Sequence, residues 1–239
     1  MKLVIFDIDG TLTNTSQVDS ICFERALAQA SGLMSSEADW SDCPHVSDTG
    51  LTRHLYQNHF GREPHDHEEV SLRDCLVDLL NEHHAQDDSW FAEIDGAAKM
   101  LIHLSEKAHW QIAVATGCWR ASAEMKLKAA QLAVHQKPGG FAEDGPSRES
   151  IVTTAIQRAS NHYGRINFDR IVSVGDGVWD VKTAANLEIA FVGVAQNSRA
   201  ELLQKHGARH VVPDFKDISR FFACLDDAVI PTQSRSTAV

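Results

Sequence analysis

Two carboxylates stand at the end of an apolar run near the start of the chain. Residues 3–6 read Leu-Val-Ile-Phe, and Asp7 and Asp9 follow just before a Gly-Thr turn. Short apolar segments that stop at a turn are typical of strands buried on both faces of a parallel sheet, and ligands bind outside the carboxyl ends of such strands. One carboxylate there can attack phosphorus, while another protonates the leaving oxygen and then activates water. Asp7 and Asp9 are therefore candidate catalytic residues.

A second pair of carboxylates follows another apolar run, residues 170–174. The sequence continues Gly-Asp-Gly-Val-Trp-Asp, so Asp176 and Asp180 are one helical turn apart. If they lie near Asp7, the three groups repel one another unless a hard cation sits between them, and such an oxygen-rich site selects Mg²⁺. We predict that Asp176 binds the metal directly and that Asp180 acts through water or by positioning. Trp179 is expected to pack under the core rather than against a substrate.

Alternating strand and helix patterns provide the elements that would position these residues. Further strand-like segments end at turn signals, at residues 111–116, 170–174, 188–194 and 208–212. Amphipathic helical patterns lie between them, for example at residues 148–160. Strands that alternate with helices imply βαβ units. The fold class is therefore predicted to be α/β with a parallel sheet.

The long stretch between the first two strands differs from the rest of the chain. Residues 15–90 are rich in histidine and acidic residues and hold helical apolar stripes, but no convincing strand. The dipeptide Ser31-Gly32 is typical of a helix end. We predict a helical cap at residues 15–90, inserted into a core formed by residues 1–14 and 91–239.

Composition narrows the possible partners and location. The 239 residues carry a formal net charge of −11, which argues against a nucleic-acid backbone or an anionic membrane as the main partner. The five cysteines are scattered and never at Cys-x-x-Cys spacing, which fits a reducing compartment. Because Asp7 and Asp9 interrupt the apolar N-terminal stretch, neither a signal peptide nor a transmembrane helix is expected there. A cytoplasmic location is predicted.

The two acidic motifs resemble those of a known superfamily. Asp-x-Asp-Gly-Thr at residues 7–11 and Gly-Asp-x-x-x-Asp at residues 175–180 resemble the first and last motifs of the haloacid dehalogenase superfamily, most of whose members are Mg²⁺-dependent phosphatases. The resemblance implies a Rossmann-like core with a C1-type helical cap, closest to the phosphoglycolate phosphatase and β-phosphoglucomutase group. It also implies that Asp7 is the nucleophile and that Mg²⁺ is held by Asp7, the backbone carbonyl of Asp9, and Asp176. Relatives that dehalogenate lack an Asp at the position of Asp9.

Phosphate binding requires a hydroxyl, backbone N–H groups and a cation. Thr116 matches the Ser/Thr motif of the superfamily, and the N–H groups that follow it, from Gly117 on, can hold phosphate oxygens. Two residues are candidates for the cation. Lys137 lies in a Lys-Pro dipeptide common in the superfamily, whereas Arg148 opens the helix that leads to the segment at 170–174, where the superfamily places its basic residue. We favour Arg148, whose planar fork would grip the phosphate.

Substrate selection is expected to reside in the cap. The loop at residues 45–52 lies where superfamily members carry a specificity loop, so His45, Asp48, Thr49 and Arg53 are candidates to reach the leaving group, although an ordinary interhelical turn explains the pattern equally well. The cap histidines, including His65 and His67, fit a solvated face better than a metal site. For Cys118 we predict packing rather than catalysis.

Together these features predict a Mg²⁺-dependent phosphatase that hydrolyses a small phosphorylated metabolite through an aspartyl-phosphate. One alternative is a sugar-phosphate mutase that uses the same nucleophile, and another is a binding protein that keeps the fold without turnover. No nucleic-acid or membrane partner is expected, and the chain is predicted to be a monomer or homodimer.

Overall fold

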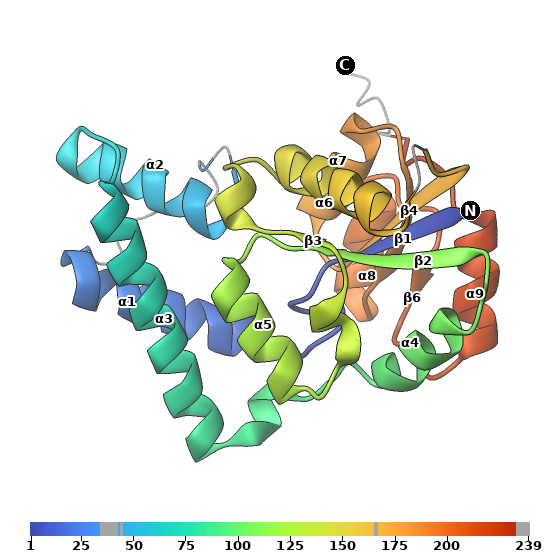
Figure 1. Cartoon of the computed structure of the whole chain (residues 1–239), viewed down its shortest axis with the longest axis horizontal. Helices are drawn as coiled ribbons and strands as arrows, with labels where there is room; N and C mark the ends of the chain where they lie inside the picture. The colour runs from blue at the N-terminus through green and yellow to red at the C-terminus, as the bar shows by residue number, and fades with distance from the viewer. Residues whose placement is uncertain (34–42, 44, 165–166, 233–239) are drawn as a thin grey trace.

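The computed structural model describes residues 1–33, 43, 45–164 and 167–232, and within them a parallel sheet forms the centre of the molecule (Figure 1). Its six strands lie in the order β3-β2-β1-β4-β5-β6, and each pair of neighbours is parallel. The strands are β1 (Lys2–Phe6), β2 (Trp110–Ala115), β3 (Gly139–Gly140), β4 (Arg170–Gly175), β5 (Ala190–Val194) and β6 (Val211–Val212). The predicted α/β class with a parallel sheet is confirmed.

The central strand β1 is buried on both faces because its residues are almost all apolar. Val4 and Phe6 contribute to one hydrophobic cluster, and Leu3 and Ile5 contribute to the other. This division follows from the alternation of side chains along a strand. The first cluster is covered by α4 (Ala97–Ser105), α5 (Arg120–Ala129) and α9 (Ile218–Asp227), and the second by α6 (Arg148–His162), α7 (Val178–Asn186) and α8 (Asn197–Lys205). Asp7 follows directly after this strand, so packing on both faces of the sheet fixes the position of its backbone.

The segment between β1 and β2 is helical and stands to one side of the sheet (Figure 1). It contains α1 (Ser16–Ser31), α2 (Asp48–Phe60), α3 (Asp66–Gln86) and the short 3₁₀ helix η3 (Asp88–Phe91), which we call the cap helices. The predicted end of the first of them is confirmed, because Gly32 follows α1 with a φ of 74°, a left-handed conformation that favours glycine. The domain limits at residues 14/15 and 90/91 stay a prediction.

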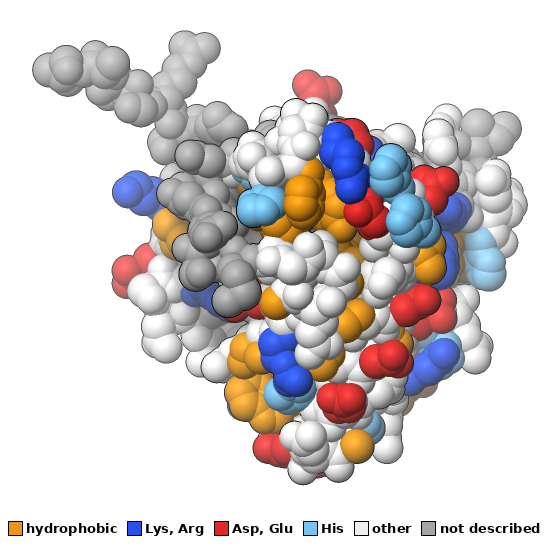
Figure 2. All heavy atoms as spheres, turned by 90° about the vertical axis from the view of Figure 1, so that its left-hand side faces the viewer, with side chains coloured by type: hydrophobic (Ala, Val, Ile, Leu, Met, Phe, Trp, Pro, Cys, Tyr) orange, Lys and Arg blue, Asp and Glu red, His pale blue; other side chains and the backbone are white. Residues whose placement is uncertain are grey.

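The cap helices bury an apolar cluster of their own, to which the core also contributes. Leu72, Leu76 and Leu80 from α3 belong to it, together with Trp119 from the loop before α5. The outer face of the cap carries acidic, basic and histidine side chains (Figure 2). Among the described residues, none of the helices combines the length and apolar character needed to span a bilayer.

Strand β3 lies in a segment that looks like a glycine-rich loop in the sequence. A Cβ on Gly140 would lie 2.0 Å from the carbonyl oxygen of Ile151, and a Cβ on Gly139 would lie 2.8 Å from Val114. The absence of a side chain at both glycines therefore lets the backbone of β3 pack closely against β2 and α6. Composition alone does not reveal so short a strand, because the pairing depends on contacts distant in sequence.

Candidate active site

Asp7 lies directly after β1 and is the centre of the candidate site. Its side chain is only 6% exposed. The Thr11 hydroxyl donates a hydrogen bond of 3.3 Å to Oδ2, and Arg148 Nη1 donates one of 3.3 Å to Oδ1. The carboxylate is therefore held in a fixed orientation with one oxygen against a cation, as a nucleophile at a strand end requires.

Asp176 and Asp180 lie beside Asp7, and carboxylate oxygens of the three lie within 4.8 Å of one another. Burial, reinforced by repulsion among these groups, raises the pKa of Asp7 to about 8, that of Asp176 to about 7 and that of Asp180 to about 6. The arrangement is thus unfavourable for three free carboxylates at neutral pH. A divalent cation among them would remove the repulsion.

The surroundings of the two Asp176 carboxylate oxygens also favour a bound metal ion. Asp176 Oδ1 is buried and has no hydrogen-bond partner among the described residues, while Oδ2 faces Arg199 Nη1 at 3.1 Å. An orphaned buried carboxylate oxygen is costly unless a cation binds it. Gly10, with φ at 79°, allows the loop after β1 to approach the Asp176 side chain closely, because a Cβ at Gly10 would lie 2.3 Å from Asp176 Oδ2. The donor set of hard oxygens suits Mg²⁺.

Asp180 belongs to this acidic group and also contacts its surroundings. Its Oδ2 accepts the N–H of Gly177 at 3.0 Å, and its Oδ1 lies 3.7 Å from Arg148 Nη1. The carboxylate therefore fixes the loop after β4 and faces the same guanidinium as Asp7. Its action through water or by positioning stays a prediction.

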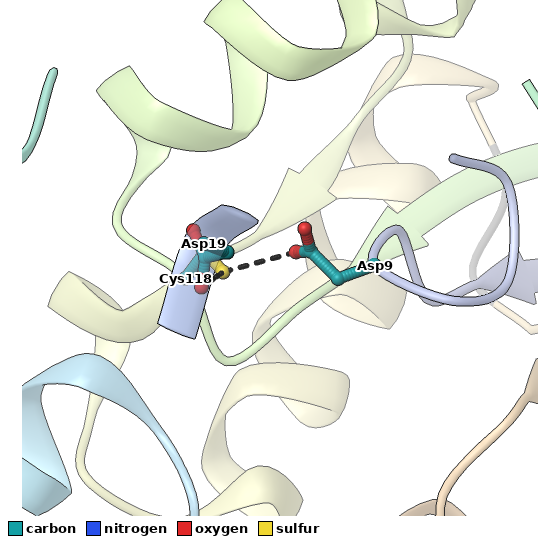
Figure 3. A group of neighbouring side chains, drawn as sticks. All are labelled: Asp9, Asp19 and Cys118. Atoms are coloured by element: carbon teal, nitrogen blue, oxygen red, sulfur yellow. Dashed lines mark hydrogen bonds between the residues drawn. The ribbon is translucent and has the colours of Figure 1, made fainter. Parts of the chain in front are cut away.

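The Asp9 carboxylate points away from this acidic group and into a second cluster. Lys126 Nζ lies 2.7 Å from both of its oxygens, and the Thr15 hydroxyl donates a hydrogen bond of 2.6 Å. Cys118 Sγ donates a further bond of 3.1 Å, and Asp19 of α1 faces the same place (Figure 3). The structure does not bring the Asp9 side chain to the candidate metal ligands. Its predicted place in the metal site rests on its backbone carbonyl.

Lys126 is the functional residue that the sequence did not reveal. It is fully buried on α5, and its Nζ also lies 2.8 Å from Asp19 Oδ1 and 3.1 Å from Cys118 Sγ. Burial lowers the pKa of Lys126, but the carboxylates of Asp19 and Asp9 outweigh it and hold the pKa well above its usual range. The Lys126 ammonium thus links Asp9, the candidate acid-base residue, to Asp19 on α1. A helical pattern does not distinguish this lysine from surface lysines, although its position beside buried Leu127 is a weak signal.

Cys118 takes part in this cluster as a hydrogen-bond donor. Burial, followed by the charges of Asp19 and Asp9, raises its pKa well above the usual thiol range. A protonated, buried thiol is a poor nucleophile. The expectation that Cys118 packs rather than reacts agrees with this geometry, but its neighbours are charged side chains as well as apolar ones.

The candidate phosphate-binding residues lie after β2, the strand beside β1, and at the start of α6. Thr116 is buried, and its hydroxyl accepts the N–H of Cys118 at 3.2 Å. Gly117 lies against the Arg148 guanidinium, because a Cβ there would lie 2.7 Å from Nη2. Lys137, by contrast, lines a separate cavity with Ile102 and other residues. The structure therefore brings Arg148, and not Lys137, to Asp7.

The four candidate specificity residues separate into two groups. His45 and Asp48 line a cavity of about 710 Å³ between the cap helices and the core, which Arg148 also lines. Thr49 is buried away from it and accepts the Trp119 indole N–H at 3.0 Å. Arg53 faces acidic side chains of the cap at 3.5 Å. Thr49 and Arg53 do not line this cavity, because successive residues of α2 point in different directions. Their contact with the leaving group stays a prediction.

Trp179 also departs from expectation. Its side chain is 38% exposed, and it lines the same cavity instead of packing under the core. The exposed His65 and His67 stack on each other at 5.7 Å, and neither belongs to a metal-capable group of the described residues.

The fold and the acidic strand ends define an α/β protein with a buried acidic site, and comparison with known proteins identifies the family. Residues 4–194 match the model of the haloacid dehalogenase-like hydrolases. This match covers most of the chain, so the protein belongs to that family. Among curated proteins, none matches the chain significantly.

Solved structures with the same fold share little sequence with this chain. A hydrolase from Pseudomonas syringae is 20% identical, with a TM-score of 0.67, and the match covers 95% of this chain and 99% of that one. A phosphonoacetaldehyde hydrolase-like protein from Oleispira antarctica is 15% identical, with a TM-score of 0.65 and coverage of 95% and 92%. CbbY from Rhodobacter sphaeroides, in complex with xylulose-(1,5)bisphosphate, is 16% identical, with a TM-score of 0.60 and coverage of 90% and 95%.

Proposed function

We propose that this family member is a Mg²⁺-dependent phosphatase that hydrolyses a phosphate monoester of a small metabolite through an aspartyl-phosphate on Asp7. The observation that carries the proposal is the surroundings of this carboxylate. One oxygen faces Arg148 at 3.3 Å, and Asp176 and Asp180 lie close enough to share a cation with it. The candidate nucleophile, the candidate phosphate-binding cation and the candidate metal ligands therefore lie together at the carboxyl ends of the neighbouring strands β1 and β4.

In the first step an Asp7 oxygen attacks phosphorus and the bond to the leaving oxygen breaks. Arg148 holds the phosphoryl oxygens as a planar fork, and the backbone N–H groups after Thr116 support them. Asp9 is the candidate to give its proton to the leaving oxygen. Burial opposes ionisation of its carboxyl, but Lys126 outweighs burial and holds the pKa of Asp9 below its usual value, so this step requires the side chain to turn from Lys126 towards the ester. Mg²⁺, held by Asp7, Asp176 and the backbone carbonyl of Asp9, would offset the negative charge of the transferred group.

In the second step water attacks the phosphoryl group and gives its proton to Asp9, which releases phosphate and restores the Asp7 carboxylate. Lys126 and Thr15 fix the Asp9 side chain through bonds of 2.7 and 2.6 Å. We assign both a positioning role, since neither reaches the acidic group that contains Asp7. The mutase remains the alternative, and one structural relative does hold a sugar bisphosphate. Activity that depends on an added bisphosphate, without net phosphate release, would favour it.

Removal of the metal is expected to abolish turnover. The three buried carboxylates repel an anionic substrate and one another until a cation is bound. Ca²⁺ should substitute poorly because its looser coordination spoils in-line geometry. The checks are phosphate release with Mg²⁺, with Ca²⁺ and with chelator, and the rise in melting temperature on Mg²⁺ addition, which Asp176→Asn should remove. Full activity in metal-free buffer would contradict the site.

Arg148→Ala is expected to reduce turnover of every phosphate ester by a similar large factor. The guanidinium contacts the transferred group, which all esters share, and its loss also leaves Asp7 without its cation. Lys137→Ala is the matched control, since Lys137 lines another cavity. Steady-state kinetics on several monoesters provide the measurement. A severe uniform loss in the Lys137 variant together with near-normal Arg148→Ala would show that the cation is misassigned.

A further inference from the structure

The indole of Trp179 lines the cavity between the cap helices and the core, which Arg148 also lines. It stands between Asp176 and Asp180, two members of the acidic group, in the first turn of α7. Trp179 is 38% exposed, lines the cavity between cap and core, and belongs to none of the hydrophobic clusters that the described residues form.

Two neighbours hold this ring in place. A Cβ on Gly177 would lie 2.1 Å from indole Cε2, so the ring packs directly against the backbone of that glycine. The Arg148 Cζ lies 5.8 Å from the ring centroid, and the same guanidinium reaches Asp7 at 3.3 Å. The Arg148 guanidinium therefore lies near both the indole ring and the Asp7 carboxylate.

The rest of the cavity favours a leaving group with an apolar part. Phe23, Val46, Leu51 and Val178 line it, together with charged and polar residues that include Asp19, Glu24, Glu149, Lys182 and Asn186. Its volume of about 710 Å³ lies within the range of cavities that enclose whole organic ligands.

We propose that Trp179 is a specificity-determining residue that stacks on a planar ring of the leaving group. The substrate class is then phosphate monoesters with an aromatic or heterocyclic group close to the phosphate. This inference rests on the proposed function, because it takes phosphate to lie between Asp7 and Arg148. Offset or edge contacts between rings add attraction beyond the burial of area, which a saturated group does not obtain.

Benzyl phosphate and cyclohexylmethyl phosphate provide a matched test, since both are alkyl esters of equal charge and similar size. The wild-type enzyme should prefer the benzyl ester in kcat/KM by roughly two- to tenfold. Trp179→Leu, which keeps an apolar side chain without a ring, should bring this ratio close to one, and Trp179→Phe should retain most of it. Trp90→Leu is the control, because Trp90 is a partly buried tryptophan of the cap cluster that does not line the cavity.

Binding to an Asp7→Asn background separates this inference from the proposed function. Calorimetry with both esters should show tighter binding of the benzyl ester, and this difference should disappear when Trp179→Leu is added. Absence of turnover in the wild type with every ester would contradict the proposed function alone. Equal kcat/KM for both esters in the wild type, or a ratio unchanged by Trp179→Leu, would overturn the role of Trp179. The wild-type comparison decides the matter even if the variant does not fold.

Discussion

Asp7→Asn is expected to abolish phosphate release while the fold is retained. The amide keeps the size and hydrogen-bonding shape of the side chain but is a far weaker nucleophile, so no aspartyl-phosphate forms. The structure adds an expectation on stability. Burial raises the pKa of Asp7 to about 8, so the ionised group is costly in the folded state without a cation. In metal-free buffer at neutral or higher pH, the variant should therefore unfold at a temperature no lower than the wild type.

Phosphate release and thermal unfolding of the purified variant provide the measurement. Asp95→Asn is a suitable control, because Asp95 pairs with Lys216 on the surface and should tolerate the same change. Substantial turnover by Asp7→Asn would overturn the covalent mechanism. A large fall in its melting temperature without metal would instead contradict the burial and repulsion described around Asp7.

Lys126→Met is expected to have the largest effect on stability. Its ammonium is fully buried between Asp9 and Asp19, at 2.7 and 2.8 Å. Removing one partner of a buried ion pair leaves uncompensated charge and costs about 3–5 kcal/mol in the free energy of unfolding. Turnover should fall as well, since Asp9 loses the contact that orients its carboxylate.

Denaturant unfolding at neutral pH measures the effect. Lys128→Met is the matched control, because Lys128 is exposed two residues further along the same helix and pairs only loosely with Glu124 at 3.9 Å. Its loss should cost at most about 1 kcal/mol. Adding Asp19→Asn to Lys126→Met should restore part of the lost stability. Equal unfolding free energies for the two lysine variants would show that the buried cluster does not form.

The features predicted well from the sequence are those determined by local pattern. An uninterrupted apolar run identified β1 as a strand buried on both faces, and the glycine-containing turns after β1 and β4 marked the strand ends that carry Asp7 and Asp176. Arg148 was favoured over Lys137 by resemblance, because it opens the helix where the superfamily places its basic residue, and the structure places it at Asp7.

The features that were missed depend on pairs far apart along the chain. Asp9 and Lys126 are 117 residues apart, and only the folded arrangement of the cap and α5 brings them together. Trp179 was misjudged because helical periodicity does not tell whether the first turn of α7 faces a cavity or a packed interior. The segment at 45–52 was interpreted as a loop, but residues 48–52 form the start of α2, and the direction of each side chain could not be derived from spacing.

The contacts between cap and core have a consequence for how new activities can arise in this chain. Arg148 donates to the carbonyl of Val46 at 2.7 Å, Asp48 N–H donates to the carbonyl of Gly117 at 2.7 Å, and Lys126 binds Asp19. The first two contacts use backbone groups of the cap, which another cap sequence can supply, whereas the third needs the Asp19 carboxylate. A foreign cap spliced into this core would therefore have to provide a carboxylate at that place, or the buried Lys126 would lose one of its two acidic partners. Exchange of whole caps is thus constrained chiefly by one buried side chain.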